Sequence, residues 1–423
     1  MSSTPVAGRP SYAVVLRVPH ARRTFAAALL ARLSYGVVPL SVMLAVTRAT
    51  GSYAVAGTVM ALFSGTSVFL SPARATLIDR HGPRRVLVPM TAAHASLLCL
   101  LTVLVWRPGV PSLALGAVTA AAGACTPPLG PTMRAVWGRL APDRALLQRA
   151  YSLDGVAEEL LFVSGPLLVG VLVGVAAPAA GIAFGTALML AGTAGFVSSP
   201  AVRAIGPGPG RGGPDRPGAA SRGVLRGIAQ PVVGAVGVGL ALGAVDLVVV
   251  AFAGQRGYGD NAVAWTLAAL SAGSAVGGLL NGAVAWRVPA RTRLPLTAAG
   301  LGLALLAAGL APGLGTLAAA LAVAGCFVAP ALTTAYLVAD EAAAPEARVR
   351  AGAWVNTGVN AGSTGGAAGA GLLLGGLPTA LCFAAAGGAA LLTALATARS
   401  APERATAGGA RSGLRPPIVQ PED

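Results

Sequence analysis

The sequence predicts an all-α membrane protein with twelve transmembrane helices, arranged as two pseudo-symmetric six-helix bundles with both termini in the cytoplasm. Three observations predict this fold: the composition, the distribution of the arginines and an internal repeat. The 423 residues are 55% hydrophobic and only 10% charged, and the mean hydropathy is +0.73. Such a composition is typical of a chain surrounded by lipid rather than water, so a soluble protein is excluded.

The net charge and the scattered polar residues argue against a nucleic-acid-binding protein, a metal- or cofactor-binding protein and an enzyme. The formal charge of +16 comes from thirty arginines that punctuate long apolar runs, whereas nucleic-acid binders cluster their basic residues on one polar face. The four cysteines lie in apolar runs without CxxC spacing or a neighbouring histidine, so neither a metal site nor a cofactor is expected. No catalytic or phosphate-binding motif is present in a suitable context, so an enzyme is not expected.

Twelve apolar runs are long enough to cross a bilayer, which takes about 20 residues. The first run contains Arg32, and no small-residue cleavage pattern precedes a mature domain, so it is a span and not a signal peptide. The twelve predicted spans cover residues 24–46, 53–70, 86–105, 112–133, 150–173, 178–197, 228–253, 262–286, 294–310, 316–339, 352–374 and 377–398.

The arginines predict the orientation, because cytoplasmic loops are enriched in Lys and Arg. With the N-terminus inside, 26 of the 30 arginines fall in cytoplasmic loops or tails. Arg48, Arg107 and Arg256 fall on the opposite side, and Arg32 alone lies within a span. Arginine-rich and arginine-poor loops thus alternate along the chain, and a wrong number of spans would destroy this alternation. We therefore expect a multi-pass protein of the cell membrane with cytoplasmic termini.

The chain divides at its middle, where residues 198–227 are rich in Pro, Gly and Arg and have too little apolar surface to order themselves. A shift of 203 residues aligns six similar positions of the two halves, among them Pro127 with Pro330 and Gly155 with Gly358. This register favours a duplication of a six-helix unit. The predicted domains are an N-terminal cytoplasmic tail (1–23), a first bundle (24–197), a cytoplasmic linker (198–227), a second bundle (228–398) and a disordered cytoplasmic tail (399–423).

The loop between the second and third spans reads ATLIDRHGPRR over residues 75–85. It resembles the loop signature Gly-x-x-x-Asp-Arg-x-Gly-Arg-Arg of the major facilitator superfamily. Ala75 replaces the first glycine, and Pro83 interrupts the basic pair. The resemblance implies the two-bundle fold of that superfamily. The matching residues are Asp79, Arg80, Gly82 and Arg84.

An acid in a basic loop at a helix end can pair with an arginine of a neighbouring helix and hold one side of a transporter closed in one of two states. We expect this gating role for Asp79, with Arg134 at the end of the fourth span as its partner. The alternative for Arg80, Arg84 and Arg85 is that they set the topology and face lipid headgroups.

The fifth span contains three acids, which are costly in a membrane and are therefore functional candidates. Asp154 and Glu158 share a helix face, where two carboxylates repel unless one is protonated or a cation lies near. Arg32 is the only cation expected inside the membrane, at a similar depth of roughly 12 Å. We expect an Arg32–Glu158 ion pair, with Asp154 or Glu159 as a further proton-binding or substrate-facing carboxylate. The alternative is a static ion pair that fixes helix packing.

Other residues of the fifth and eleventh spans complete the candidate set. Gly165 and Pro166 resemble the Gly-Pro signature in the fifth helix of the superfamily's drug/proton antiporters, and a bend is expected there. In the register of the repeat, Asn356 and Asn360 belong to a neutral polar set that stands opposite the acids of the fifth span.

The predicted function is secondary active transport by alternating access. No nucleotide-binding motif is present, and the intramembrane carboxylates favour protons as the driving ion. The resemblance implies efflux of a small amphipathic molecule, a drug or a secondary metabolite. Two alternatives stay open, namely proton-coupled uptake of a metabolite such as a sugar or amino acid, and a non-transporting membrane sensor on the same fold. The expected partners are a small-molecule substrate, protons and the lipid bilayer, and the protein is expected to work as a monomer.

Overall fold

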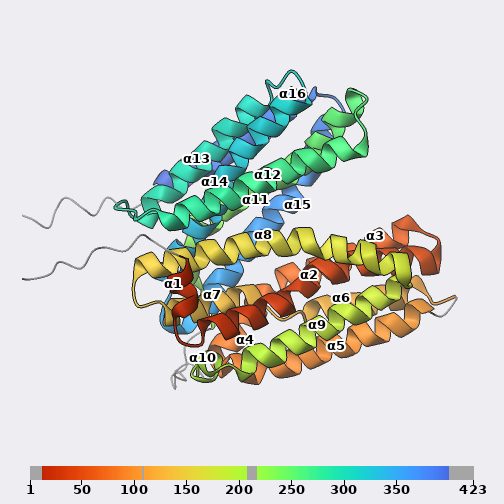
Figure 1. Cartoon of the computed structure of the whole chain (residues 1–423), viewed down its shortest axis with the longest axis vertical. Helices are drawn as coiled ribbons and strands as arrows, with labels where there is room; N and C mark the ends of the chain where they lie inside the picture. Colours follow the sequence, from red (N-terminus) through yellow and green to blue (C-terminus); the bar gives the residue numbers. More distant parts are fainter. Residues whose placement is uncertain (1–11, 107–108, 207–216, 400–423) are drawn as a thin grey trace, which may run out of the picture.

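The computed structural model describes residues 12–106, 109–206 and 217–399, which form a bundle of helices (Figure 1). The centre of the predicted linker and the predicted tail beyond Arg399 lie outside the described residues. The first half contains α1 (Ala13–Arg17), α2 (Ala21–Thr50), α3 (Tyr53–Phe69), α4 (Ser71–His81), α5 (Pro83–Trp106), α6 (Ser112–Ala124), α7 (Leu129–Leu140), α8 (Arg144–Val175), α9 (Pro178–Ser198) and α10 (Pro200–Arg203). The second half contains α11 (Pro217–Gln255), α12 (Asp260–Ala283), α13 (Ala290–Ala308), α14 (Leu314–Ala342), the 3₁₀ turn η1 (Pro345–Ala347), α15 (Arg348–Leu374) and α16 (Thr379–Arg399).

Each predicted span falls mainly on helical residues. Within the described residues, nine helical segments are long and apolar enough to cross a membrane, and a tenth is added if α3 and α4, bent by 40° at their junction, form one span. The helices α13 and α15 are not among these segments. Arginines occupy the first turn of α13, and α15 is rich in Gly, Asn and Thr, which lowers the hydropathy of both. The number of twelve spans stays a prediction.

The turn between α7 and α8 differs from the prediction. The fourth and fifth spans were expected to end and begin at residues 133 and 150, but α7 continues to Leu140 and α8 already begins at Arg144. Asp143 caps α8, since its carboxylate accepts a hydrogen bond of 2.8 Å from the backbone N–H of Leu146. Both helices therefore extend past the apolar run, and Arg134 becomes part of a helix instead of a loop.

The fourth span is broken between α6 and α7. The pair Pro127–Pro128 has no backbone N–H to continue α6, and the end of α6 is completed by Arg74 of α4. Its guanidinium donates hydrogen bonds of 2.6 and 2.9 Å to the carbonyls of Gly123 and Ala124. The repeat-related helix α14 runs unbroken through its single proline, Pro330. The two halves thus differ in structure at this point.

Parts of the predicted linker are helical. The short helix α10 lies within it, and α11 begins at Pro217, ahead of the predicted start of the second bundle. Val202 of α10 is fully buried, and α10 contacts α2, α5, α7 and α9. Burial of this apolar side chain stabilises α10 against the first half, which the composition of the stretch as a whole did not indicate.

The helices form two groups, α2 to α9 and α11 to α16, which meet at one end of the molecule and diverge at the other (Figure 1). The apolar cores of the described residues follow the same division. One core belongs to the first half and another to the second, while a third includes residues of both, such as Trp137 and Tyr336. We call the end with the shared core the closed end.

Glycines allow close approach of the helix backbones. A Cβ atom on Gly165 of α8 would lie 2.6 Å from the Cα atom of Gly36 on α2, and glycines bring α11 close to α15 and α12 close to α14 in the same way. The helix α8 continues through Pro166 as one element. Gly165 is therefore a packing residue in this conformation, and a bend at Gly165 and Pro166 stays a proposal.

Candidate functional site

Four charged side chains inside the first helix group form a closed set of ion pairs, which we call the charge cluster: Arg32, Arg134, Asp154 and Glu158. The Arg32 Nη1 and Nη2 atoms lie 2.6 Å from Asp154 Oδ1 and 3.0 Å from Glu158 Oε1. The Arg134 Nε atom lies 3.1 Å from Asp154 Oδ2, and its Nη2 donates to Glu158 Oε2. Each arginine therefore contacts both carboxylates.

The cluster is buried except at one edge. The side chains of Arg32, Arg134 and Asp154 are 1%, 5% and 0% exposed, whereas that of Glu158 is 28% exposed. Two arginines balance two carboxylates, which offsets part of the cost of removing the charges from water. Glu158 is the member of the cluster whose side chain is partly exposed.

Aromatic residues connect the cluster to its surroundings. The Arg134 guanidinium lies 3.8 Å from the ring centroid of Tyr336 on α14, so the second helix group covers the cluster with a cation–π contact. The Tyr151 hydroxyl donates a 3.1 Å hydrogen bond to the Arg134 carbonyl. The Tyr35 hydroxyl donates to the carbonyl of Pro127, at the break between α6 and α7. Arg134 thus lies where the broken fourth span meets the second helix group.

The structure contains the predicted Arg32–Glu158 ion pair. The expectation that Arg32 is the only buried cation beside these acids was wrong, because Arg134 contacts the same two carboxylates. Asp154 is not a free carboxylate but is held by both arginines. The signal that could have revealed this arrangement is Asp143, a typical helix N-cap residue. A turn placed there would have moved Arg134 from the predicted loop into a helix.

Asp79 has a different partner from the one predicted. Its carboxylate accepts hydrogen bonds from the backbone N–H groups of Val349, at 3.3 Å, and Arg350, at 2.9 Å. Both belong to the first turn of α15, where the helix dipole is positive. The prediction of Arg134 as partner was wrong, because Arg134 is held in the charge cluster. Asp79 nevertheless joins the two helix groups at the closed end.

The other residues of the loop motif surround Asp79 without sharing its contact. Arg80 and Arg84 are exposed. Gly82 ends α4 with a φ of +84°, a backbone conformation that favours glycine, and its N–H donates to the Ile78 carbonyl. This turn directs the chain from α4 into α5.

The remaining candidates lie outside the charge cluster. The Glu159 carboxylate accepts a 2.9 Å hydrogen bond from Ser274 of α12, so it also connects the two groups. Asn360 donates to the Asn356 carbonyl within α15. Thr357, between them, donates to the Val68 carbonyl of α3. Among the described residues, neither asparagine has a hydrogen bond to the cluster.

Besides Arg134, two further buried arginines were counted as loop residues in the sequence. Arg74 and Arg293 are each only 6% exposed. Arg74 completes the end of α6, as described above, and Arg293 of α13 donates a 3.0 Å hydrogen bond to Gln148 of α8. No sequence pattern distinguished them from the exposed arginines, because both kinds lie at the ends of apolar runs.

At the level of sequence, no protein-family model matches the chain, and no curated protein matches it either. Its structure is similar to those of several transporters. The human organic anion transporter MFSD10 (TETRAN) has a TM-score of 0.66 at 18% identity, over 90% of this chain and 99% of that one. A bacterial homologue of the iron transporter ferroportin, in an outward-facing state, has a TM-score of 0.64 at 14% identity, over 90% and 97% of the two chains. A variant of the fucose:proton symporter FucP of E. coli has a TM-score of 0.65 at 14% identity, over 90% and 99%.

These similarities extend over nearly the whole length of each chain, at identities that establish the fold alone. The chain shares the all-helical fold of these three transporters.

Proposed function

We propose that this protein is a secondary active transporter that exports a small amphipathic molecule in exchange for protons. The observation that supports this most is the charge cluster, in which two arginines hold two carboxylates inside an apolar helix group and leave only Glu158 accessible. Intramembrane ionisable groups are expensive, and proton relays and substrate pathways are the functions that commonly require them.

The arrangement of the helix groups supports alternating access. Asp79 joins α4 to α15, and Arg144 of α8 forms an ion pair with Glu341 of α14. Both contacts lie at the closed end, while the groups diverge at the other end (Figure 1). With cytoplasmic termini, this conformation opens to the outside. Rocking of the two groups about the charge cluster would open the opposite side.

Protonation of Glu158 provides the coupling in this proposal. The neutral acid cannot balance an arginine, so Arg32 and Arg134 would then share the single negative charge of Asp154. The added positive charge disfavours a bound cation or the positive end of a dipole. Proton binding and substrate binding therefore exclude one another, which is the requirement for exchange. Tyr336 places the second helix group in contact with Arg134, so the change in charge can alter how the groups pack.

The test uses purified protein in liposomes that contain a pH-sensitive dye. A proton gradient is imposed, and a panel of lipophilic cations and neutral antibiotics is added. We expect substrate-dependent proton flux in the wild type and its loss in Glu158→Gln, which keeps the size of the side chain but cannot ionise. The matched control is Asp246→Asn, because Asp246 is an acid of α11 that lies outside the cluster.

Unchanged flux in Glu158→Gln would make the cluster a structural ion-pair network and contradict the proposed coupling. Equal loss of flux in Asp246→Asn would also contradict it. An absence of flux with every compound, in the wild type, would overturn export and favour uptake of a metabolite or a non-transporting sensor.

A further inference from the structure

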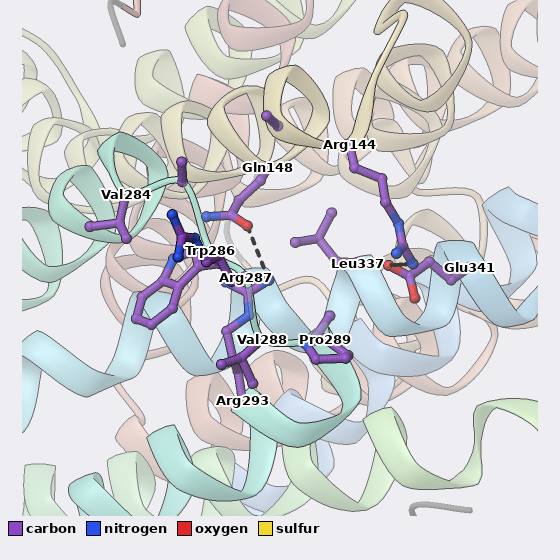
Figure 2. A pocket seen from close by; sticks show the side chains of 13 residues that line it. Arg144, Gln148, Val284, Trp286, Arg287, Val288, Pro289, Arg293, Leu337 and Glu341 are labelled. Atoms are coloured by element: carbon purple, nitrogen blue, oxygen red, sulfur yellow. Dashed lines mark hydrogen bonds and ion pairs between the residues drawn. The ribbon is translucent and has the colours of Figure 1, made fainter. Parts of the chain in front are cut away.

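A pocket of about 290 Å³ lies at the closed end, between the start of α8 and the connection from α12 to α13 (Figure 2). It is separate from the charge cluster and from Asp79. Residues of both helix groups line it. Its polar and aromatic lining consists of Arg144, Gln148, Trp286, Arg287, Arg293 and Glu341.

Arg293 lacks enough acceptors in this pocket. Its side chain is 6% exposed, and its Nη2 atom donates to the Gln148 side-chain oxygen at 3.0 Å, as the dashed line in Figure 2 marks. Its Nε and Nη1 atoms have no hydrogen-bond partner among the described residues. The guanidinium lies 5.0 Å from the ring centroid of Trp286. Buried polar groups are normally satisfied, so a buried guanidinium with two unused nitrogens indicates a missing acceptor.

The charges around Arg293 define the chemistry of that acceptor. Three guanidinium groups line the pocket against one carboxylate, and this carboxylate, of Glu341, is already paired with Arg144. The helix α13 begins beside the pocket, and its N-cap, Pro289, makes no side-chain hydrogen bond to the first turn. The positive end of the α13 dipole therefore adds to the arginines. The pocket favours an anion that offers several oxygen acceptors.

We propose that this pocket binds a phosphate group, from an anionic phospholipid headgroup or from a soluble phosphate. Phosphate oxygens match the planar fork of an arginine, and Arg293 and Arg287 are the arginines available to them. The volume is near the lower limit of about 300 Å³ for small-molecule pockets and suits a headgroup rather than a large ligand. With the predicted orientation, the pocket faces the cytoplasm, where anionic lipids attract basic segments.

A bound phosphate would lie at the junction of the two helix groups. Gln148 belongs to α8 of the first group and Arg293 to α13 of the second, and one hydrogen bond joins them. An anion on the Nε and Nη1 atoms of Arg293 fixes the guanidinium that donates to Gln148, and so stabilises the conformation in which the closed end is held together. The binding itself does not depend on transport, whereas this effect on the conformational balance rests on the proposed function.

The binding is tested with the full-length protein in detergent. Native mass spectrometry measures the affinity for dioctanoyl phosphatidic acid, with dioctanoylglycerol as the lipid without phosphate, and calorimetry measures the affinity for inorganic phosphate. We expect one equivalent of phosphatidic acid and none of dioctanoylglycerol. A higher affinity for phosphatidic acid than for inorganic phosphate identifies a lipid headgroup as the source of the phosphate group. Equal affinity for the two probes identifies a soluble phosphate as the source. Either result supports the site.

Variants assign the binding to this pocket. Arg293→Gln and Arg287→Gln should each weaken binding at least about tenfold, as expected for loss of a charge-assisted hydrogen bond. Arg287 is exposed, so its variant keeps the test valid if Arg293→Gln does not fold. The control is Arg203→Gln, an exposed arginine of α10 that does not line the pocket. Absence of binding to both probes, or equal weakening by the control, overturns the proposal. Proton flux in liposomes that persists without any phosphate binding would refute this inference and leave the proposed transport intact.

Discussion

The contact between Asp79 and α15 predicts how a single charge sets the balance between the two conformations. Burial raises the pKa of Asp79 to about 7, so the prediction is made for pH 8, where the carboxylate is charged. There, Asp79→Asn keeps an oxygen that can accept one hydrogen bond but removes the negative charge at the N-terminus of α15. A carboxylate at a helix N-terminus contributes about 0.3–1 kcal/mol when exposed and up to about 2 kcal/mol when partly buried. Asp79 is half-buried and accepts two backbone hydrogen bonds. We therefore expect a loss of about 1–2 kcal/mol for the described conformation, which shifts the ratio of the two states roughly 5- to 30-fold.

The shift is measured by the distance between spin labels at the opposite end of the molecule. Leu113, at the start of α6, and Leu310, after α13, are each 84% exposed and belong to different helix groups. With cysteines at these two positions in a background without the four native ones, Asp79→Asn should enrich the shorter label distances. The control is Arg80→Gln, an exposed neighbour of Asp79. An unchanged distance distribution, or the same change in the control, would refute the reasoning.

Two predictions concern stability and are measured by thermal unfolding in detergent. Arg134→Gln leaves the buried Asp154 and the partly exposed Glu158 on one guanidinium and should cost about 3–5 kcal/mol of the free energy of unfolding. The double variant with Glu158→Gln should regain part of this loss, and a fully additive loss would contradict the pairing. Gly165→Ala places a methyl group 2.6 Å from the backbone of Gly36 and should cost about 1–3 kcal/mol. Gly170→Ala, on the same helix with open space around its Cβ position, should be neutral or stabilising by up to about 1 kcal/mol, so equal losses at the two glycines would disprove the close contact.

The charge cluster was partly predictable because depth in a membrane can be counted along a helix. Arg32 and Glu158 are each interior to an apolar run, and ions at equal depth in neighbouring helices are expected to pair. The same counting failed for Arg134, since it depends on where the helices end. Three residues determine those ends: Pro127 and Pro128 at the break before α7, and Asp143, which caps α8.

The contact of Asp79 could not be predicted for a different reason. Its carboxylate binds backbone N–H groups of α15, which every residue other than proline possesses, so no residue type indicates them. Arg74 has the same kind of partner in the carbonyls at the end of α6. Side chains that bind backbone groups far away in the chain leave no pattern in a single sequence.

By itself, the sequence determined that this protein is helical, belongs in a membrane and has costly acids in one helix, because hydropathy, helix length and the cost of a buried charge are properties of short segments. Only the tertiary structure decided which arginines meet those acids, which end of the molecule is closed and which buried arginines keep unused hydrogen-bond donors. These depend on helix ends and on backbone groups brought together from distant parts of the chain. The charges were visible in the sequence, but their partners were set by packing.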